Sequence, residues 1–100
     1  MIVRILREAE AELVDAIARY ELMEAGLGVR LKSEIRKMAA WIGEHPELPR
    51  IRAHGYRRAN LKVFPYYLPY VVWNGTVWIL AVAHGAQRPE YWIDRSPSTR

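Results

Sequence analysis

The pattern of apolar and polar positions divides the chain into a helical half followed by a strand-forming half. Leu13, Ile17 and Tyr20 stand four and three residues apart on one helical stripe, while most acidic residues of that segment lie off it. Acidic residues also crowd the first turns, where the helix dipole favours negative charge. The spacing therefore predicts an amphipathic helix over residues 8–20 whose apolar face needs a covering layer.

A second amphipathic helix is predicted from about residue 29 to residue 42. Its apolar positions repeat at intervals of four, three and four residues: Leu31, Ile35, Met38 and Ile42. Gly26 and Gly28 separate it from the first helix, and Gly43 followed by His45-Pro46 ends it. Two such helices joined by a few residues should form an antiparallel hairpin with one apolar side.

Short β-prone segments lie on either side of the predicted helices. Residues 2–6 are almost entirely apolar and predict a leading strand. Residues 58–64 alternate, with Ala59, Leu61 and Val63 pointing one way and polar or basic side chains pointing the other. This second segment is therefore predicted to be a half-buried strand with a basic outer face.

Asn74-Gly75 is the strongest hairpin signal in the chain, because it lies between two β-prone runs. Counting outward from a two-residue turn gives the pairs Trp73–Thr76, Val71–Trp78, Tyr70–Ile79, Leu68–Ala81 and Tyr67–Val82. One face of this sheet, suited to lie under the helices, collects Tyr66, Leu68, Tyr70, Val72, Val77, Ile79, Ala81 and Ala83. The other face collects Tyr67, Val71, Trp73, Trp78, Leu80, Val82 and His84.

The second face carries large rings that a chain of 100 residues has no further layer to cover. Large aromatic side chains exposed on a sheet usually mean that a partner binds there. Pro69 favours an edge or a bulge, since it donates no backbone hydrogen bond. We therefore predict an α+β fold in one domain over residues 1–95, a disordered tail over residues 96–100, and a bare aromatic sheet face.

The distribution of charge along the chain adds to the prediction of a binding surface. The formal net charge is +4, but residues 1–47 carry a net −2, whereas residues 48–89 carry six cations and no acid. A basic, aromatic sheet suits a partner with negative charge and flat rings, or an acidic protein segment. A solvated basic surface that only keeps the protein soluble is an equally open explanation.

The remaining composition excludes several classes of site. The chain has no cysteine, which excludes disulfides, thiolate metal sites and thiol catalysis. His45 and His54 lack paired ligands at metal spacing, so we expect no metal and no cofactor. Charges arrive early in the sequence and no apolar stretch approaches membrane-spanning length, so we expect a cytoplasmic protein without a membrane partner.

Several motifs, taken in order, resemble the RelE/ParE superfamily of toxins from bacterial type II toxin–antitoxin systems. The resemblance covers nearly the whole chain and includes the leading strand and the Gly26-Leu27-Gly28 joint. One part of the chain carries the most specific motifs. That part comprises Phe64-Pro65-Tyr66, Tyr70, the ILAVAH stretch over residues 79–84, and RPEYW over residues 88–92. It is most similar to the ParE branch.

The resemblance implies a β-α-α-β-β-β fold, with a helical hairpin on one face of a mainly antiparallel four-stranded sheet. It also implies a cognate antitoxin whose acidic, flexible C-terminal region wraps the toxin, in a possible hetero-oligomer. ParE-like members inhibit DNA gyrase and take part in plasmid stabilisation, whereas RelE-like members cut messenger RNA in the ribosome.

We favour a toxin that binds gyrase without chemistry of its own. Trp, Tyr and Arg dominate interface energetics, and Arg side chains give charge complementarity to the target or to the antitoxin. The predicted contact residues are Arg57, Arg58, Lys62, Tyr67, Trp73, Trp78, Arg88, Tyr91 and Trp92. Packing is an equally good explanation for Trp92, which then closes one end of the sheet.

The alternative is a metal-independent endoribonuclease in which His84, Arg88 and Tyr91 serve as base, phosphate ligand and stacking group or acid. RelE-like members carry an arginine on the strand that corresponds to residues 66–70, and here that strand offers only Tyr, Leu and Pro. A histidine at a strand end is also more often hydrogen-bonded structure than a catalyst. A chain that binds its antitoxin and has no active target would have the same sequence features.

Overall fold

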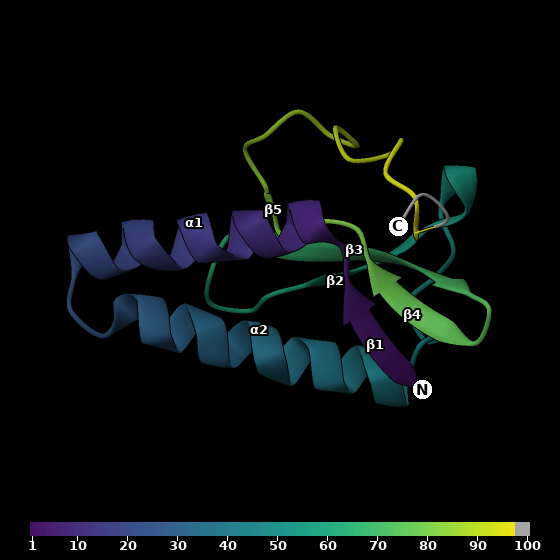
Figure 1. Cartoon of the computed structure of the whole chain (residues 1–100), viewed down its shortest axis with the longest axis horizontal. Helices are drawn as coiled ribbons and strands as arrows, with labels where there is room; N and C mark the ends of the chain where they lie inside the picture. The colour runs from purple at the N-terminus through teal and green to yellow at the C-terminus, as the bar shows by residue number, and fades with distance from the viewer. Residues whose placement is uncertain (98–100) are drawn as a thin grey trace.

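A computed structural model describes residues 1–97 of the chain as a helical hairpin packed on a sheet (Figure 1). In chain order the elements are β1 (Ile2–Ile5), α1 (Arg7–Met23), α2 (Leu27–Glu44), the 3₁₀ turn η1 (Ala53–Gly55), β2 (Arg57–Asn60), β3 (Tyr66–Trp73), β4 (Thr76–Ile79) and β5 (Ala83–His84). No helix within residues 1–97 is both long and apolar enough to cross a membrane.

The helical hairpin forms where the two apolar stripes predict it. Gly26 takes the left-handed backbone conformation at the joint, with φ of 90°. The Glu21 carboxylate accepts hydrogen bonds from the backbone N–H of Gly26 at 2.7 Å and of Gly28 at 2.9 Å. A Cβ atom at Gly28 would collide with the Ile17 carbonyl oxygen, so the two helices cross closely at this point.

The sheet has the order β1-β4-β3-β2, and β5 pairs with β3 beyond the end of β4. β1 runs parallel to β4, whereas β2, β4 and β5 each run antiparallel to β3. The predicted α+β class and the helical hairpin on a mainly antiparallel sheet are therefore confirmed. Among residues 1–97 the sheet has five strands where four were expected, because the last strand is broken into β4 and β5.

The predicted hairpin turn forms, with Asn74 and Gly75 at φ of 53° and 71°, as a two-residue primed turn requires. The predicted register holds from Trp73–Thr76 to Tyr70–Ile79. Beyond that point one extra residue lies between β4 and β5, as in a β-bulge. The predicted pair Tyr67–Val82 is therefore wrong, because Tyr67 lies opposite Ala83.

The core lies between the helices and one face of the sheet. It is built from the apolar stripes of both helices and the alternate residues of β3 and β4, including Ala9, Ala16, Leu31, Ile35, Ile42, Leu68, Tyr70, Val77 and Ile79. Val72 was predicted to lie under the helices but is 42% exposed, because it sits at the hairpin end of the sheet beyond the core. Val63 is also exposed, since β2 ends at Asn60.

The opposite face of the sheet is not bare, so the prediction of an uncovered aromatic face is wrong for its central part. The segment after β5 folds back over it and buries Trp92 to 1% exposure, and the Trp92 indole N–H donates to the Tyr67 hydroxyl at 3.2 Å. Tyr67 is itself 6% exposed. Ser96 is half-buried and Pro97 buried, so these two residues are not a disordered tail; residues 98–100 of the predicted tail lie outside the described residues.

Candidate functional site

The C-terminal segment is fastened to α1 by one carboxylate. Glu12 accepts hydrogen bonds from the Val82 backbone N–H at 3.1 Å and the Tyr91 hydroxyl at 2.7 Å. Both terminal nitrogens of Arg95 donate to it at 3.0 Å, one to each oxygen. We call these four residues the Glu12 seam.

The seam accounts for one of the predicted site residues. Burial, and then the hydrogen bond to the Glu12 carboxylate, raise the pKa of Tyr91 well above its ordinary value. The hydroxyl is thus committed to holding the segment in place. Glu12 itself carried no signal in the sequence, because its partners are 70 to 83 residues away along the chain.

The structure does not assemble the alternative catalytic set. His84 lies opposite Tyr66, so it falls on the sheet face of Tyr66, opposite to the face predicted for it. The two rings meet edge to face at 5.1 Å, and the His84 Nδ1 accepts the Ala86 backbone N–H at 2.9 Å. Within residues 1–97 no hydrogen bond joins any two of His84, Arg88 and Tyr91.

Arg88 is exposed on the segment that follows β5. The position leaves its guanidinium accessible to a partner. Among the described residues no group of three His, Asp or Glu side chains has an arrangement that could hold a metal ion.

Part of the predicted aromatic face stays open at the hairpin end of the sheet. Cross-strand pairing there places Ile2 beside Thr76, which lies between it and Trp73, and places Arg4 beside Trp78, which lies between it and Val71. Ile2 is 62% and Trp73 46% exposed, whereas Trp78 is half-buried. We call Ile2, Arg4, Trp73 and Trp78 the distal patch. It keeps the predicted combination of indole rings and a guanidinium group.

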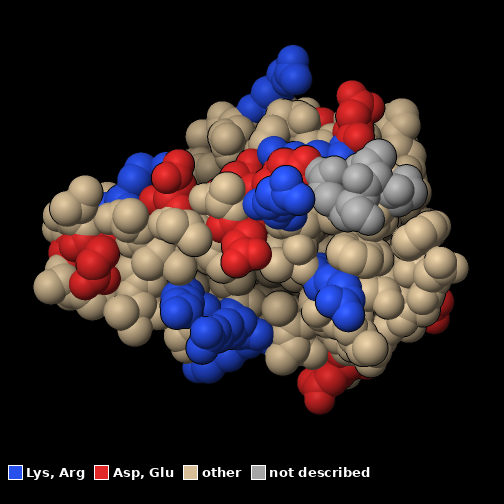
Figure 2. Space-filling model, in the orientation of Figure 1, with Lys and Arg blue, Asp and Glu red and all other residues tan. Residues whose placement is uncertain are grey.

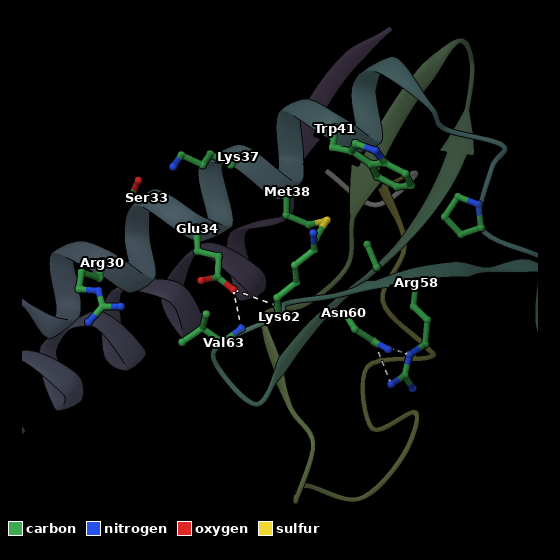
Figure 3. Close-up of a pocket in the computed structure, with 12 residues that line it drawn as sticks. Arg30, Ser33, Glu34, Lys37, Met38, Trp41, Arg58, Asn60, Lys62 and Val63 are labelled. Carbon is green, nitrogen blue, oxygen red and sulfur yellow. Dashed lines mark hydrogen bonds between the residues drawn. The ribbon is translucent and has the colours of Figure 1, made fainter.

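A second open surface lies between α2 and the edge strand β2. It is a cavity of about 820 Å³, which we call the α2–β2 groove. Figure 3 shows Glu34, Met38 and Trp41 on α2 facing Asn60 and Lys62 across it. The lining residues are Arg30, Ser33, Glu34, Lys37, Met38, Trp41, Pro49, Arg58, Ala59, Asn60, Lys62 and Val63.

Of the three predicted contact residues Arg57, Arg58 and Lys62, only the last two lie at the groove. Arg58 and Lys62 line it, and the Arg58 guanidinium lies over the Tyr67 ring at 3.9 Å while donating to the Asn60 side-chain oxygen. Arg57 points elsewhere and donates to the carbonyl oxygens of Glu47 and Pro49, at 3.1 and 2.6 Å. Arg57 therefore stabilises the loop after α2 through these two hydrogen bonds.

The charge of the groove also comes from α2. Basic residues outnumber acidic ones on α2, whereas α1 is mainly acidic. Figure 2 shows Lys and Arg side chains gathered over α2 and acidic side chains over α1. Arg30 and Lys37 of α2 and Arg58 and Lys62 of the sheet side thus line the groove together with one carboxylate, that of Glu34.

The backbone of β2 is open toward the groove, because β2 is an edge strand. Leu61 donates its N–H to Tyr66, so by alternation the amides of Arg58 and Asn60 point away from β3. Beyond Leu61, the amides of Lys62 and Val63 donate to one oxygen of the Glu34 carboxylate at 3.0 and 3.1 Å. A helix carboxylate thus already occupies one end of this edge.

Comparisons with known proteins give a family match and matches among solved structures. A family model described as "ParE toxin of type II toxin-antitoxin system, parDE" matches residues 3–89. A chain of the solved structure "Chromosomal ParDE TA system from P. aeruginosa" has a TM-score of 0.76 at 18% identity, over 84% of this chain and 95% of that one. No curated protein matches the chain. At this identity the structural likeness supports the fold, while the family match covers most of the sequence.

Proposed function

The chain belongs to the ParE toxin family of type II toxin–antitoxin systems, and we propose that it acts by binding and inhibiting DNA gyrase. In this proposal the toxin works in the cytoplasm, a partner antitoxin neutralises it, and the pair stabilises the replicon that encodes it. The family match over residues 3–89 is the observation that carries the proposal.

The geometry favours inhibition by binding over catalysis. The hydroxyl of Tyr91 is bound to Glu12, and His84 is packed against Tyr66. A ribonuclease needs a base, an acid and phosphate ligands converging on one phosphate, and within residues 1–97 no hydrogen bond links His84, Arg88 and Tyr91 to one another. The contacts that His84 and Tyr91 make with Tyr66 and Glu12 therefore favour the binding proposal over the RelE-like alternative.

The distal patch is the surface that we propose to contact gyrase. Trp73 is exposed at the end of the β3–β4 hairpin, one strand away from Ile2, and exposed tryptophans are common anchors of interfaces. Arg4 adds charge at the neighbouring position. Tyr67 and Trp92, which the sequence suggested as contacts, are buried and are left out of this surface.

A supercoiling assay with purified gyrase tests the proposal. The wild-type chain should inhibit supercoiling, and Trp73→Ala should raise the concentration for half-inhibition by about thirtyfold, the loss of a typical anchor residue. Val63→Ala, which changes another exposed apolar side chain away from the patch, should inhibit like the wild type.

Two results would count against this proposal in different ways. Unaffected supercoiling, together with messenger RNA cleavage in a translating extract that His84→Ala abolishes, would favour the RelE-like alternative. Inhibition by Trp73→Ala equal to that of the wild type would leave gyrase as the target but exclude the distal patch.

A further inference from the structure

We propose that the α2–β2 groove binds a small molecule of the nucleoside diphosphate class, with its phosphates held by the cations of the groove and its base on the apolar part. This inference goes beyond the proposed function, because it concerns a ligand of the chain itself and not its target. Three features of the groove carry it: its size, the hydrogen-bond donors that line it and its apolar surface.

The groove has the size of a small-molecule site. Its volume of about 820 Å³ falls within the range of about 300–1,000 Å³ that is usual for such sites. Figure 3 shows α2 along one side of it, and the Lys62 side chain extending across it toward Met38. A ligand that enters the groove would therefore contact both α2 and the strand side.

The groove offers donors for phosphate oxygens. The backbone amides of Arg58 and Asn60 point away from β3, toward the groove. Glu34 is the one acidic residue among the described lining residues, and its carboxylate already accepts two backbone amides. A diphosphate has several acceptor oxygens and no strong donor, so it complements this set in charge and in hydrogen bonding. The cationic side chains that line the groove are Arg30, Lys37, Arg58 and Lys62.

The apolar part of the groove suits a flat ring. Met38 and Trp41 of α2 and Ala59 of β2 line it. The Trp41 ring is stacked on His45 at a centroid distance of 5.1 Å, so it is held in place before a ligand arrives. Methionine sulfur packs favourably against aromatic rings. A nucleobase could therefore rest on Met38 and Trp41 while the phosphates reach the cations.

Polar side chains are also available for the edge of a base. Ser33 contributes a hydroxyl to the lining. The Asn60 side-chain oxygen already accepts from the Arg58 guanidinium, which leaves the amide nitrogen of Asn60 to donate.

The same lining argues against two other occupants. A single-stranded nucleic acid needs several rings on which successive bases stack, and Trp41 is the one aromatic residue among the described lining residues. A second copy of the chain joined edge to edge through β2 would bring the Arg57 and Arg58 side chains of both copies together, and like charges across a sheet repel.

Nuclear magnetic resonance on the ¹⁵N-labelled full chain tests the inference with adenosine diphosphate as the probe. It should shift the backbone amides of Arg58 and Asn60 and the indole N–H of Trp41, and leave the indole N–H of Trp73 in the distal patch unchanged. Inorganic pyrophosphate should shift the two amides without the Trp41 indole. Pyrophosphate and adenosine should each bind at least about tenfold more weakly than adenosine diphosphate, because each makes only one of the two kinds of contact.

Charge reversal supplies the matched variants. Lys37→Glu and Lys62→Glu should each weaken the binding of adenosine diphosphate by about tenfold, and the binding should fall as salt is added. Both lysines are exposed, so the variants should keep the native fold. Lys32→Glu makes the same change on the exposed surface of α2 outside the groove and should have a much smaller effect. Met38→Gln keeps the length of the side chain, and should weaken the binding of adenosine diphosphate but not of pyrophosphate.

Four outcomes would overturn the inference: no shift at Arg58 and Asn60 with millimolar adenosine diphosphate, shifts spread over the exposed cations of the whole chain, equal binding by Lys32→Glu and the two groove variants, or tighter binding of an oligothymidylate per nucleotide. None of these depends on gyrase. Nucleotide binding without gyrase inhibition would reject only the proposed target, and gyrase inhibition without nucleotide binding would reject only this inference.

Discussion

The Glu12 seam and the α2–β2 groove use the same device with opposite results. In each, a glutamate on one helix of the hairpin accepts backbone N–H groups beyond the end of a strand. Glu12 on α1 accepts the amide of Val82, and Glu34 on α2 accepts the amides of Lys62 and Val63. Both carboxylates therefore attach a helix to the sheet.

The difference lies in what covers each carboxylate. Both oxygens of Glu12 are occupied, because Arg95 and Tyr91 of the C-terminal segment close over them. One oxygen of Glu34 takes both amides, and the rest of its surroundings form a groove. One side of the sheet is thus completed by the chain itself, while the other presents an unfilled edge, where a partner has room to bind.

The largest effect is expected from a substitution in the core, on which both regions depend. Ile35 is 4% exposed on the inner face of α2. Ile35→Asp buries a charge without a partner and should cost more than about 4 kcal/mol, a large part of the stability of a small domain. Far-UV circular dichroism and urea titration should show a largely unfolded chain.

Arg36→Asp is the matched control for this variant, because it places the same side chain on the exposed side of the same helix. It should change the free energy of unfolding by less than about 0.5 kcal/mol. A native urea transition for Ile35→Asp would show that the inner face of α2 is assigned wrongly.

The second prediction compares the two carboxylates directly. Glu12→Gln should lower the free energy of unfolding by about 2 kcal/mol, because an amide nitrogen would replace one oxygen and face donors of Arg95 or Tyr91. Glu34→Gln should cost less than about 1 kcal/mol, since its remaining oxygen can still accept both amides. Urea midpoints at neutral pH measure both variants.

Hydrogen exchange shows which parts of the chain each of these two substitutions destabilises. Glu12→Gln should speed exchange in the segment that carries Trp92, and Glu34→Gln should speed exchange only at Lys62 and Val63. Equal losses of stability in the two variants would contradict the distinction between a closed seam and an open groove.

The sequence predicted what depends on local pattern. The two apolar stripes located α1 and α2, and Asn74-Gly75 located the hairpin and set its register as far as Tyr70–Ile79. These features follow from the preferences of neighbouring residues. The family resemblance, confirmed by the match over residues 3–89, added the order of the elements.

The sequence could not predict contacts made by the irregular C-terminal segment. Trp92 carried no periodic signal, so packing and a contact with the target were equally good explanations for it, and the sequence did not indicate that it would cover Tyr67 and bury a face expected to be bare. The bulge before β5 also carried no signal in the sequence. It places His84 on the other face, since a single inserted residue reverses every later side chain. The groove depends on Glu34 and on an open strand edge, which no sequence motif marks.

The smallest predicted effect concerns the pH dependence of the Glu12 seam. Burial, and then the hydrogen bond to Glu12, raise the pKa of Tyr91, so the folded chain keeps this proton at a pH where the unfolded chain loses it. The stabilisation is therefore fully present below the ordinary tyrosine pKa near 10 and is lost as pH rises above it. Tyr91→Phe should reduce the stability lost between about pH 9 and pH 11 by at most about 1 kcal/mol, measured by urea unfolding at each pH. Because the two proteins differ only in the Tyr91 hydroxyl, their difference isolates the seam, and parallel stability curves for the two proteins would mean that the Tyr91 hydroxyl is not held by Glu12.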